Sequence, residues 1–133
     1  MNLVIDTNTL FTFFWKGSLI KKLLTAEHNL FSPDFALEEL NKHKLEIISK
    51  AGISSKIFDE LITYMQELIK FIPLSEYASN LSKAFLLLNK HPKDVDFLAL
   101  ALKLKASIIS NDSELTKQSV IKIYNKSKFS ELF

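Results

Sequence analysis

The feature that most constrains the fold is a long apolar segment that runs into a short β-branched one. Residues Asp94 to Leu102 are strong helix formers and are apolar on nearly all sides, which predicts a buried helix. After a short polar connection, Ser107 to Ile109 has the composition of a buried strand. A helix followed directly by a core strand is half of an α/β unit, so we expect a mostly parallel sheet covered by helices.

Two aspartates flank this helix–strand unit. Asp94 stands at the start of the helix, and Asp112 follows the strand after Ser110 and Asn111. In an α/β layer the helix begins, and the strand ends, at the same edge of the sheet, so these two carboxylates can meet. Open α/β sheets bind their ligands at that edge.

A third acid is expected there from the first strand. Leu3 to Ile5 is a short apolar run that ends at Asp6, and Thr7 or Asn8 is expected to cap the helix that follows. Taken alone, Asp6 is more simply interpreted as a helix N-cap. It becomes a candidate site residue because the other acids are predicted at the same edge.

The remaining periodicity predicts an alternation of helices and short strands in one domain, residues 1–133. Its main insertion is a helical hairpin at about 34–70, which begins after Pro33 and turns at Gly52. The other expected elements are helices at 10–15, 19–24 and 75–88 (closed by His91 and Pro92), strands at 29–32 and 120–124, a short strand or extended connector at 71–74, a short helix at 113–117 and a docked aromatic tail at 129–133.

Two neighbouring glutamates lie in the first helix of this hairpin, near the same edge of the sheet. Glu38 and Glu39 are both within two turns of the helix start, and one of them can point into the cleft. A solvated helical face is the simpler interpretation for Glu38. Glu39, next to Leu40, is therefore our choice for the inward side chain.

Composition excludes several classes of protein. There is no cysteine, which excludes disulfides and thiolate metal sites, fits a reducing compartment and leads us to expect a cytoplasmic protein. Neither a secretory signal nor an apolar run of about 18 residues is visible, so no membrane association is expected. The net charge of +2 is weak evidence for a polyanionic partner, and all 17 basic residues are lysines.

Familiar catalytic motifs are also missing from the sequence. With two glycines there is no glycine-rich phosphate loop, and no serine lies in a nucleophile-elbow motif. The three histidines, His28, His43 and His91, have no paired metal-ligand spacing. The aromatic residues lie mostly in apolar stripes, which favours core packing over base stacking.

What remains is a set of acids at one edge of one sheet: Asp6, Glu39, Asp94 and Asp112, with Asp96 beside them. Gathered carboxylates repel one another unless a cation neutralises them. Oxygen ligands without sulfur or paired imidazole select Mg²⁺ or Mn²⁺, and such ions are suited to phosphodiester hydrolysis. The alternative is that these acids are separate helix caps.

The segments that carry these acids resemble the sequence motifs of the PIN-domain family. Val4 to Asn8 is similar to its opening strand motif, and Ser32 through Leu40 to its second block. Asp94 through Leu102, and Ser110 to Asp112, are similar to its third and fourth blocks. The four blocks occur in the family's order between residue 3 and about residue 115.

The resemblance implies a three-layer α/β/α sandwich and a Mg²⁺- or Mn²⁺-dependent ribonuclease, typified by the toxin of VapBC toxin–antitoxin pairs. It implies RNA as substrate, an antitoxin partner and a homodimer. The metal-binding and catalytic acids would be Asp6, Glu39, Asp94 and Asp112, supported by Thr7, Asn8, Ser110 and Asn111.

Several alternatives stay open. Glu38 competes with Glu39 for one role, and Asp96 is an extra acid that joins the site or lies on the surface. Lys42 and Lys93 are candidate phosphate contacts. A PIN-like module that binds metal or RNA without cleaving is the second hypothesis, and a domain that binds a small phosphorylated ligand ranks last.

Overall fold

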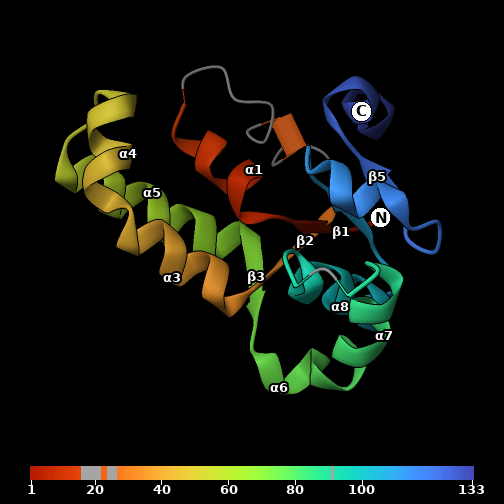
Figure 1. The fold of residues 1–133 in the computed structure, drawn as a ribbon. Coiled ribbons are helices and arrows are strands. Elements are labelled where there is room, and N and C mark those ends of the chain that lie inside the picture. The colour runs from red at the N-terminus through yellow and green to blue at the C-terminus, as the bar shows by residue number, and fades with distance from the viewer. Residues whose placement is uncertain (16–21, 24–26, 91) are drawn as a thin grey trace.

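A parallel five-stranded sheet forms the centre of the protein, in the strand order β3-β2-β1-β4-β5 (Figure 1). This computed structural model describes residues 1–15, 22–23, 27–90 and 92–133. Every neighbouring pair of strands is parallel. The strands are β1 (Asn2–Ile5), β2 (Asn29–Pro33), β3 (Ile69–Ile72), β4 (Ser107–Ile109) and β5 (Ile123–Tyr124).

Helices cover both faces of the sheet, so the expected α/β/α sandwich is confirmed. The helix α1 (Thr7–Phe11) lies on one face, whereas α7 (Leu81–Leu87) and α8 (Val95–Leu104) lie on the other (Figure 1). The central strand β1 is covered on both faces, and its residues Leu3, Val4 and Ile5 are fully buried. Strands buried on both faces are apolar throughout rather than alternating, as in this one.

The helix α8 has the environment that its composition predicts. It packs against β1, β2 and β4 on one side and against α7 and α6 (Leu74–Tyr77) on the other. Its residues from Phe97 to Ala101 are all buried. A helix enclosed on two sides has little need of a polar face, which explains its nearly uniform apolar sequence.

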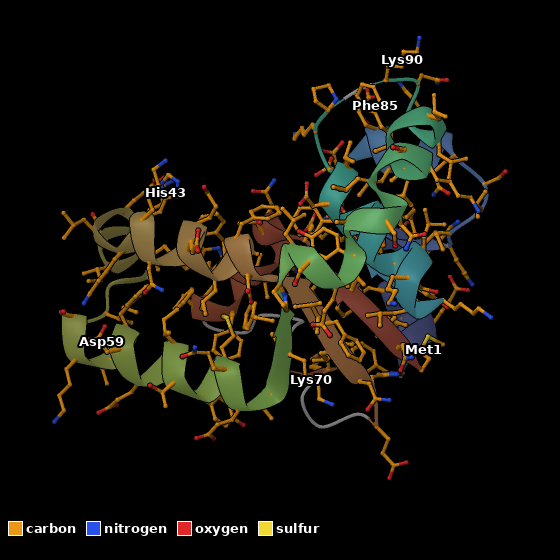
Figure 2. The ribbon with its side chains drawn as sticks, turned by 90° about the horizontal axis from the view of Figure 1, so that it is seen from below. Met1, His43, Asp59, Lys70, Phe85 and Lys90 are labelled. Carbon is orange, nitrogen blue, oxygen red and sulfur yellow. The ribbon has the colours of Figure 1, made fainter. Side chains whose placement is uncertain are left out.

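The predicted hairpin at about 34–70 is present and projects beyond the sheet as an arm (Figures 1 and 2). It consists of α3 (Asp34–Lys42), α4 (Lys44–Ala51) and α5 (Ser55–Leu68). Its first half is two helices rather than one, because the backbone leaves helical geometry at His43, with φ −97° and ψ 18°. The His43 ring packs edge-on against Phe11 of α1 at that point. Gly52 ends α4 in the left-handed conformation, with φ 66°.

Other elements differ in extent from the expectation. Asp6, and not Thr7 or Asn8, is the N-cap of α1. The helix expected over 10–15 continues α1 as η1 (Thr12–Phe14), and the one expected over 75–88 is divided by η2 (Ala78–Asn80). Most of the helix expected at 19–24, and His91, lie outside the described residues.

The last strand is shorter than its sequence pattern predicts. The N–H groups of Val120 and Ile121 donate to the side-chain oxygen of Gln118 instead of to a neighbouring strand, so β5 begins only at Ile123. Two 3₁₀ helices lie on either side of β5 along the chain, η3 (Ser113–Lys117) before it and η4 (Lys126–Leu132) after it. Of the two aromatic residues expected to dock the tail, Phe129 is buried, whereas Phe133 is 58% exposed; Leu132 is buried beside them in the sequence.

Within the residues that the structure describes, no helix combines the length and apolarity needed to cross a bilayer.

Candidate functional site

A cleft at the carboxyl edge of the sheet consists of two adjoining hollows. The larger, of about 560 Å³, lies over the ends of β1, β4 and β5. The smaller, of about 260 Å³, lies between the start of α8 and the helix α3. Asp6, Asn8 and Lys93 line both hollows, so the two form one continuous acidic and polar site.

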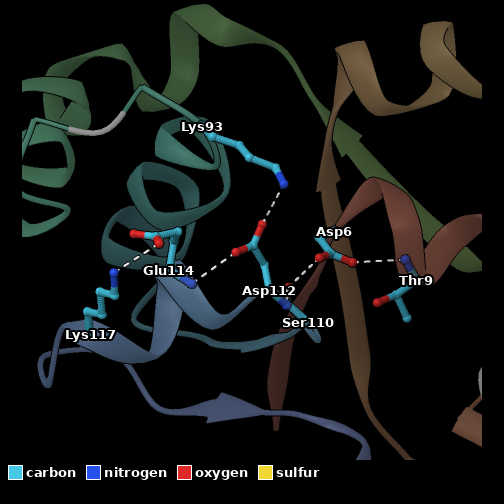
Figure 3. A network of polar contacts seen from close by, with 7 residues as sticks. All are labelled: Asp6, Thr9, Lys93, Ser110, Asp112, Glu114 and Lys117. Atoms are coloured by element: carbon cyan, nitrogen blue, oxygen red, sulfur yellow. Dashed lines mark hydrogen bonds and ion pairs between the residues drawn. The ribbon is translucent and has the colours of Figure 1, made fainter.

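Asp6 is held rigidly at the end of β1. Its side chain is 3% exposed. The carboxylate accepts a hydrogen bond from the Thr9 N–H at 2.9 Å through Oδ1 and one from the Ser110 hydroxyl through Oδ2 (Figure 3). The interpretation of Asp6 as an N-cap is therefore correct for one oxygen, and the other is turned toward the end of β4.

Ser110 connects two of the acids. Its hydroxyl donates to Asp6 and accepts a hydrogen bond from the Asp112 N–H at 3.0 Å. With 1% exposure it is among the most buried polar residues described. The sequence suggested only a supporting role for Ser110, and the structure places it between the ends of β1 and β4.

Asp112 has a partner on each oxygen. Oδ1 accepts from the Glu114 N–H at 2.9 Å, as an N-cap of η3, and Oδ2 lies 2.9 Å from Lys93 Nζ (Figure 3). A hydrogen bond from the Asp94 carboxyl, together with those from Lys93 and Glu114, holds the pKa of Asp112 well below its usual range. Asp112 is therefore ionised at neutral pH.

Asp94 is in the opposite situation. It occupies the N-cap position of α8 with a left-handed backbone, φ 68° and ψ 5°, yet its side chain makes no capping hydrogen bond. Its Oδ2 is buried and has no partner among the described residues. Burial, a hydrogen bond to Asp112 and repulsion from Asp112 and Asp6 raise the pKa of Asp94 to about 7.

The two glutamates of α3 are separated by the structure. Glu39 lines the smaller hollow, and its Oε2 lies 3.5 Å from Nε2 of His43. Glu38 is exposed and lines neither hollow. Glu39 thus lies on the cleft side with a histidine close to it, and no hydrogen bond joins it to the aspartates in the described chain.

The extra acid Asp96 lies outside the cleft. Its Oδ2 accepts a hydrogen bond of 2.6 Å from the hydroxyl of Tyr77, which belongs to α6. Burial is the largest cause of the raised pKa of Tyr77, and this hydrogen bond is the second largest. Asp96 therefore connects two helices and lines neither hollow.

The supporting residues divide between the hollows. Thr7 lines the smaller one, Asn111 lines the larger one, and Asn8 lines both. Of the two lysines expected to contact phosphate, Lys93 lines both hollows and Lys42 lines neither.

Part of the cleft was not identified from the sequence. Tyr124, Asn125, Lys126 and Phe129 also line the larger hollow. Asn125 follows β5 as Asp112 follows β4, so the rule applied to the other strands would have found it. Lys126 and Phe129 belong to η4, whose position over the sheet edge no local pattern indicates.

The donor set is compatible with a hard divalent cation. Nowhere in the described ranges do three or more acidic, histidine or cysteine side chains lie close enough to hold an ion as they stand. Mg²⁺, however, keeps several water ligands and is commonly bound through one or two carboxylates. The paired Asp94 and Asp112 would supply these, since one Asp94 oxygen is buried without a hydrogen-bond partner in the described chain, and Asp6 is near enough to act electrostatically.

Comparisons with known proteins agree with this architecture. The family model described as PIN domain matches residues 4–130. Among solved structures, the chain is similar to one in the crystal structure of VapBC2 from Rickettsia felis bound to a DNA fragment from their promoter. The TM-score is 0.69 at 14% identity, over 94% of this chain and 98% of that one. No curated protein sequence matches the chain.

Proposed function

The chain belongs to the PIN domain family, and on this premise we propose that it is a Mg²⁺- or Mn²⁺-dependent endoribonuclease that hydrolyses RNA phosphodiester bonds. PIN domains are nucleases as a family. The ion, the substrate and the catalytic residues are our inference from the cleft.

One observation carries the proposal. The carboxyl groups of Asp94 and Asp112 interact across the cleft, and one buried oxygen of Asp94 has no partner in the described chain. Two carboxylates in this position repel each other unless a proton or a cation lies between them. A divalent cation would neutralise the two carboxylates and give the unpartnered Asp94 oxygen a partner. A carboxylate that only caps a helix needs no cation.

Asp94 and Asp112 would hold the cation, and Asp6 and Glu39 line the same cleft. A bound divalent cation lowers the pKa of the attacking water and stabilises negative charge on the phosphoryl oxygens. Thr9 and Ser110 fix the orientation of Asp6. Lys93 can exchange its contact with Asp112 for a phosphate oxygen of the substrate.

The experiment compares cleavage of single-stranded RNA by the wild type and four variants, with Mn²⁺ and with EDTA. Asp94→Asn and Asp112→Asn should each reduce the rate by at least about 100-fold, because each removes a ligand charge. Glu39→Gln should have a smaller effect. Glu38→Gln, on the exposed neighbour, is the matched control and should cleave at the wild-type rate.

A wild-type rate in Asp94→Asn, or cleavage that persists in EDTA, would exclude the proposed mechanism. The second candidate, a PIN-like module that binds without cleaving, predicts a different result. Calorimetry would then detect Mn²⁺ binding to the wild type, but RNA would remain intact.

Two partners are also proposed. The similarity in fold to a VapBC2 chain suggests an antitoxin that covers the cleft, which co-expression with the product of an adjacent gene and co-purification would test. We further propose a homodimer, which the resemblance to the PIN-domain family implies. A monomeric mass in sedimentation equilibrium would contradict the dimer.

A further inference from the structure

We infer that the larger hollow is a nucleobase subsite, which receives an unpaired base, best a uracil, of the RNA strand beside the cleaved bond. This inference rests on the proposed function and extends it to the class of substrate. It assigns a role to the part of the cleft that the acids do not use.

The position of the hollow is the first argument. It is bounded by the residues that follow three neighbouring strands: Asp6 after β1, Asp112 after β4 and Asn125 after β5. Lys93 and Asp112 form part of its wall, so a nucleotide placed there has its phosphate beside the acidic pair. A volume of about 560 Å³ is in the range of small-molecule sites, and a phosphate group alone would not fill it.

The lining of the hollow suits a planar, partly apolar ligand. Ile109, Tyr124 and Phe129 all line it, and all three are buried with little exposed surface. Apolar and aromatic contact is the sequence-independent part of single-strand recognition, since every base has an apolar face. An ion or a free phosphate would gain nothing from these contacts.

The rim of the hollow offers hydrogen-bond donors. Asn111 Oδ1 accepts from the Lys126 N–H at 2.8 Å, and Asn125 Oδ1 accepts from the Lys128 N–H at 3.2 Å. Because a backbone N–H fixes each oxygen, the amide orientation is determined by these contacts. The Nδ2 groups of both side chains make no hydrogen bond within the described part of the protein, so each can donate to a ligand.

Lysines line the hollow together with carboxylates. Lys93 and Lys126 offset the charges of Asp6 and Asp112 there, so the phosphate of a nucleotide can contact a lysine at the wall. Donors on the rim select bases with carbonyl acceptors. Uracil carries two such carbonyls, whereas adenine has no carbonyl and places a donor amino group beside its ring-nitrogen acceptors, so uridine should be preferred to adenosine.

The test measures binding of nucleotides in EDTA, where no cleavage occurs. Uridine 5′-monophosphate and ribose 5-phosphate carry the same phosphate and differ by the base. The uridine nucleotide should bind at least about five-fold more tightly, from one net hydrogen bond or one base contact. In ¹⁵N–¹H spectra it should also shift the side-chain NH₂ signals of Asn111 and Asn125, which ribose 5-phosphate should leave nearly unchanged.

Asn125→Asp provides the decisive variant. Aspartate keeps the oxygen that accepts from Lys128 and removes the NH₂ donor, so the local fold is retained. Its added charge should weaken both ligands alike, whereas loss of the donor should weaken only the uridine nucleotide. The affinity ratio of the two ligands should therefore fall toward one. Asn41→Asp, on an exposed residue of α3 away from the cleft, is the matched control and should leave the ratio unchanged.

Equal affinity of the wild type for the two ligands would overturn the subsite, as would a ratio that Asn125→Asp leaves unchanged. The outcome is independent of nuclease activity, because it is measured without metal. A protein that cleaves no RNA but binds the uridine nucleotide selectively would contradict the proposed function and retain the subsite. A protein that cleaves RNA but does not distinguish the two ligands would support the proposed function and contradict the subsite.

Discussion

At the scale of single residues, Asp94 is the side chain whose arrangement the fold alone explains least. Its backbone is left-handed, its carboxyl is close to two other acids, and one of its oxygens is buried without a partner in the described chain. Each of these features costs stability. Features of this kind occur where function requires them. A cation between Asp94 and Asp112 would relieve both the repulsion between the acids and the lack of a partner for the buried oxygen.

Asp94→Asn should stabilise the protein at alkaline pH in the absence of metal. The pKa of Asp94 is raised in the folded state to about 7 from 3.8, so the folded protein binds more protons than the unfolded chain between these values. The contribution of the Asp94 carboxyl to the free energy of unfolding is fully present below about pH 4 and is lost as the pH rises through 7. Asparagine also tolerates the left-handed backbone. We expect a gain of roughly 1–2 kcal/mol at pH 8, after allowance for solvent screening of a half-buried carboxyl.

Urea unfolding of the wild type and Asp94→Asn in EDTA, between pH 5 and pH 8, measures this difference. Taking the difference between the two proteins removes the contribution of the other titrating groups. A difference that does not grow with pH would show that the Asp94 carboxyl is not strained. Loss of stability in the variant at pH 8 would show the same.

The acids could be predicted at this scale, but their partners could not. Asp6, Asp94 and Asp112 each follow a strand or precede a helix, which is a property of local sequence. The pairing of Lys93 with Asp112 and of Glu39 with His43 depends on side-chain conformations, which sequence patterns do not determine. The sequence predicted one cluster of four acids. In the structure two of them, Asp94 and Asp112, form a pair, and Asp6 and Glu39 line the cleft around it.

At the scale of elements, the contact between α6 and α8 keeps the start of α8 in place. Tyr77 is almost fully buried and donates its hydroxyl proton to Asp96, two residues after Asp94. The sequence left open whether Asp96 belongs to the metal site. Tyr77 and Asp96 belong to different helices, and only the packing of α6 on α8 shows that they meet.

Tyr77→Phe should therefore reduce stability and leave the chemistry intact. The variant removes the hydroxyl that Asp96 accepts from, at a cost of about 1.5–3 kcal/mol for a hydrogen bond to a charged group. Chemical denaturation measures this, and Mn²⁺-dependent RNA cleavage below the unfolding transition should keep the wild-type rate. Tyr64→Phe, on a more exposed tyrosine of α5, should change neither quantity. A cleavage rate reduced as far as in Asp94→Asn would instead place Asp96 in the catalytic machinery.

Element boundaries were predicted best where local signals are strong. Gly52 ends α4 where the sequence predicted the turn of the hairpin, and Ser54 then caps α5. The break at His43 and the short β5 were not predicted, because each depends on contacts from elsewhere: Phe11 packs on His43, and Gln118 occupies two N–H groups that a longer strand would use.

At the scale of the whole molecule, the strand order creates the site. Strand β1 lies between β2 and β4. The chain first adds β2 and β3 on one side of β1 and then adds β4 and β5 on its other side. The crevice at such a reversal lies beyond the carboxyl ends of the strands, where Asp6 and Asp112 stand. The class of fold was predictable from apolar runs and helix periodicity. The larger hollow was not, since η4 reaches the sheet edge only in the folded chain.

The most direct test of the central claim, that separate acids form one divalent cation site, is a crystal soaked in Mn²⁺ and examined by anomalous diffraction. We predict one strong peak in contact with the carboxylates of Asp94 and Asp112, with Lys93 moved away from Asp112, and no such peak in a soaked crystal of Asp94→Asn. Manganese bound elsewhere, with the Lys93–Asp112 ion pair intact, would contradict the account.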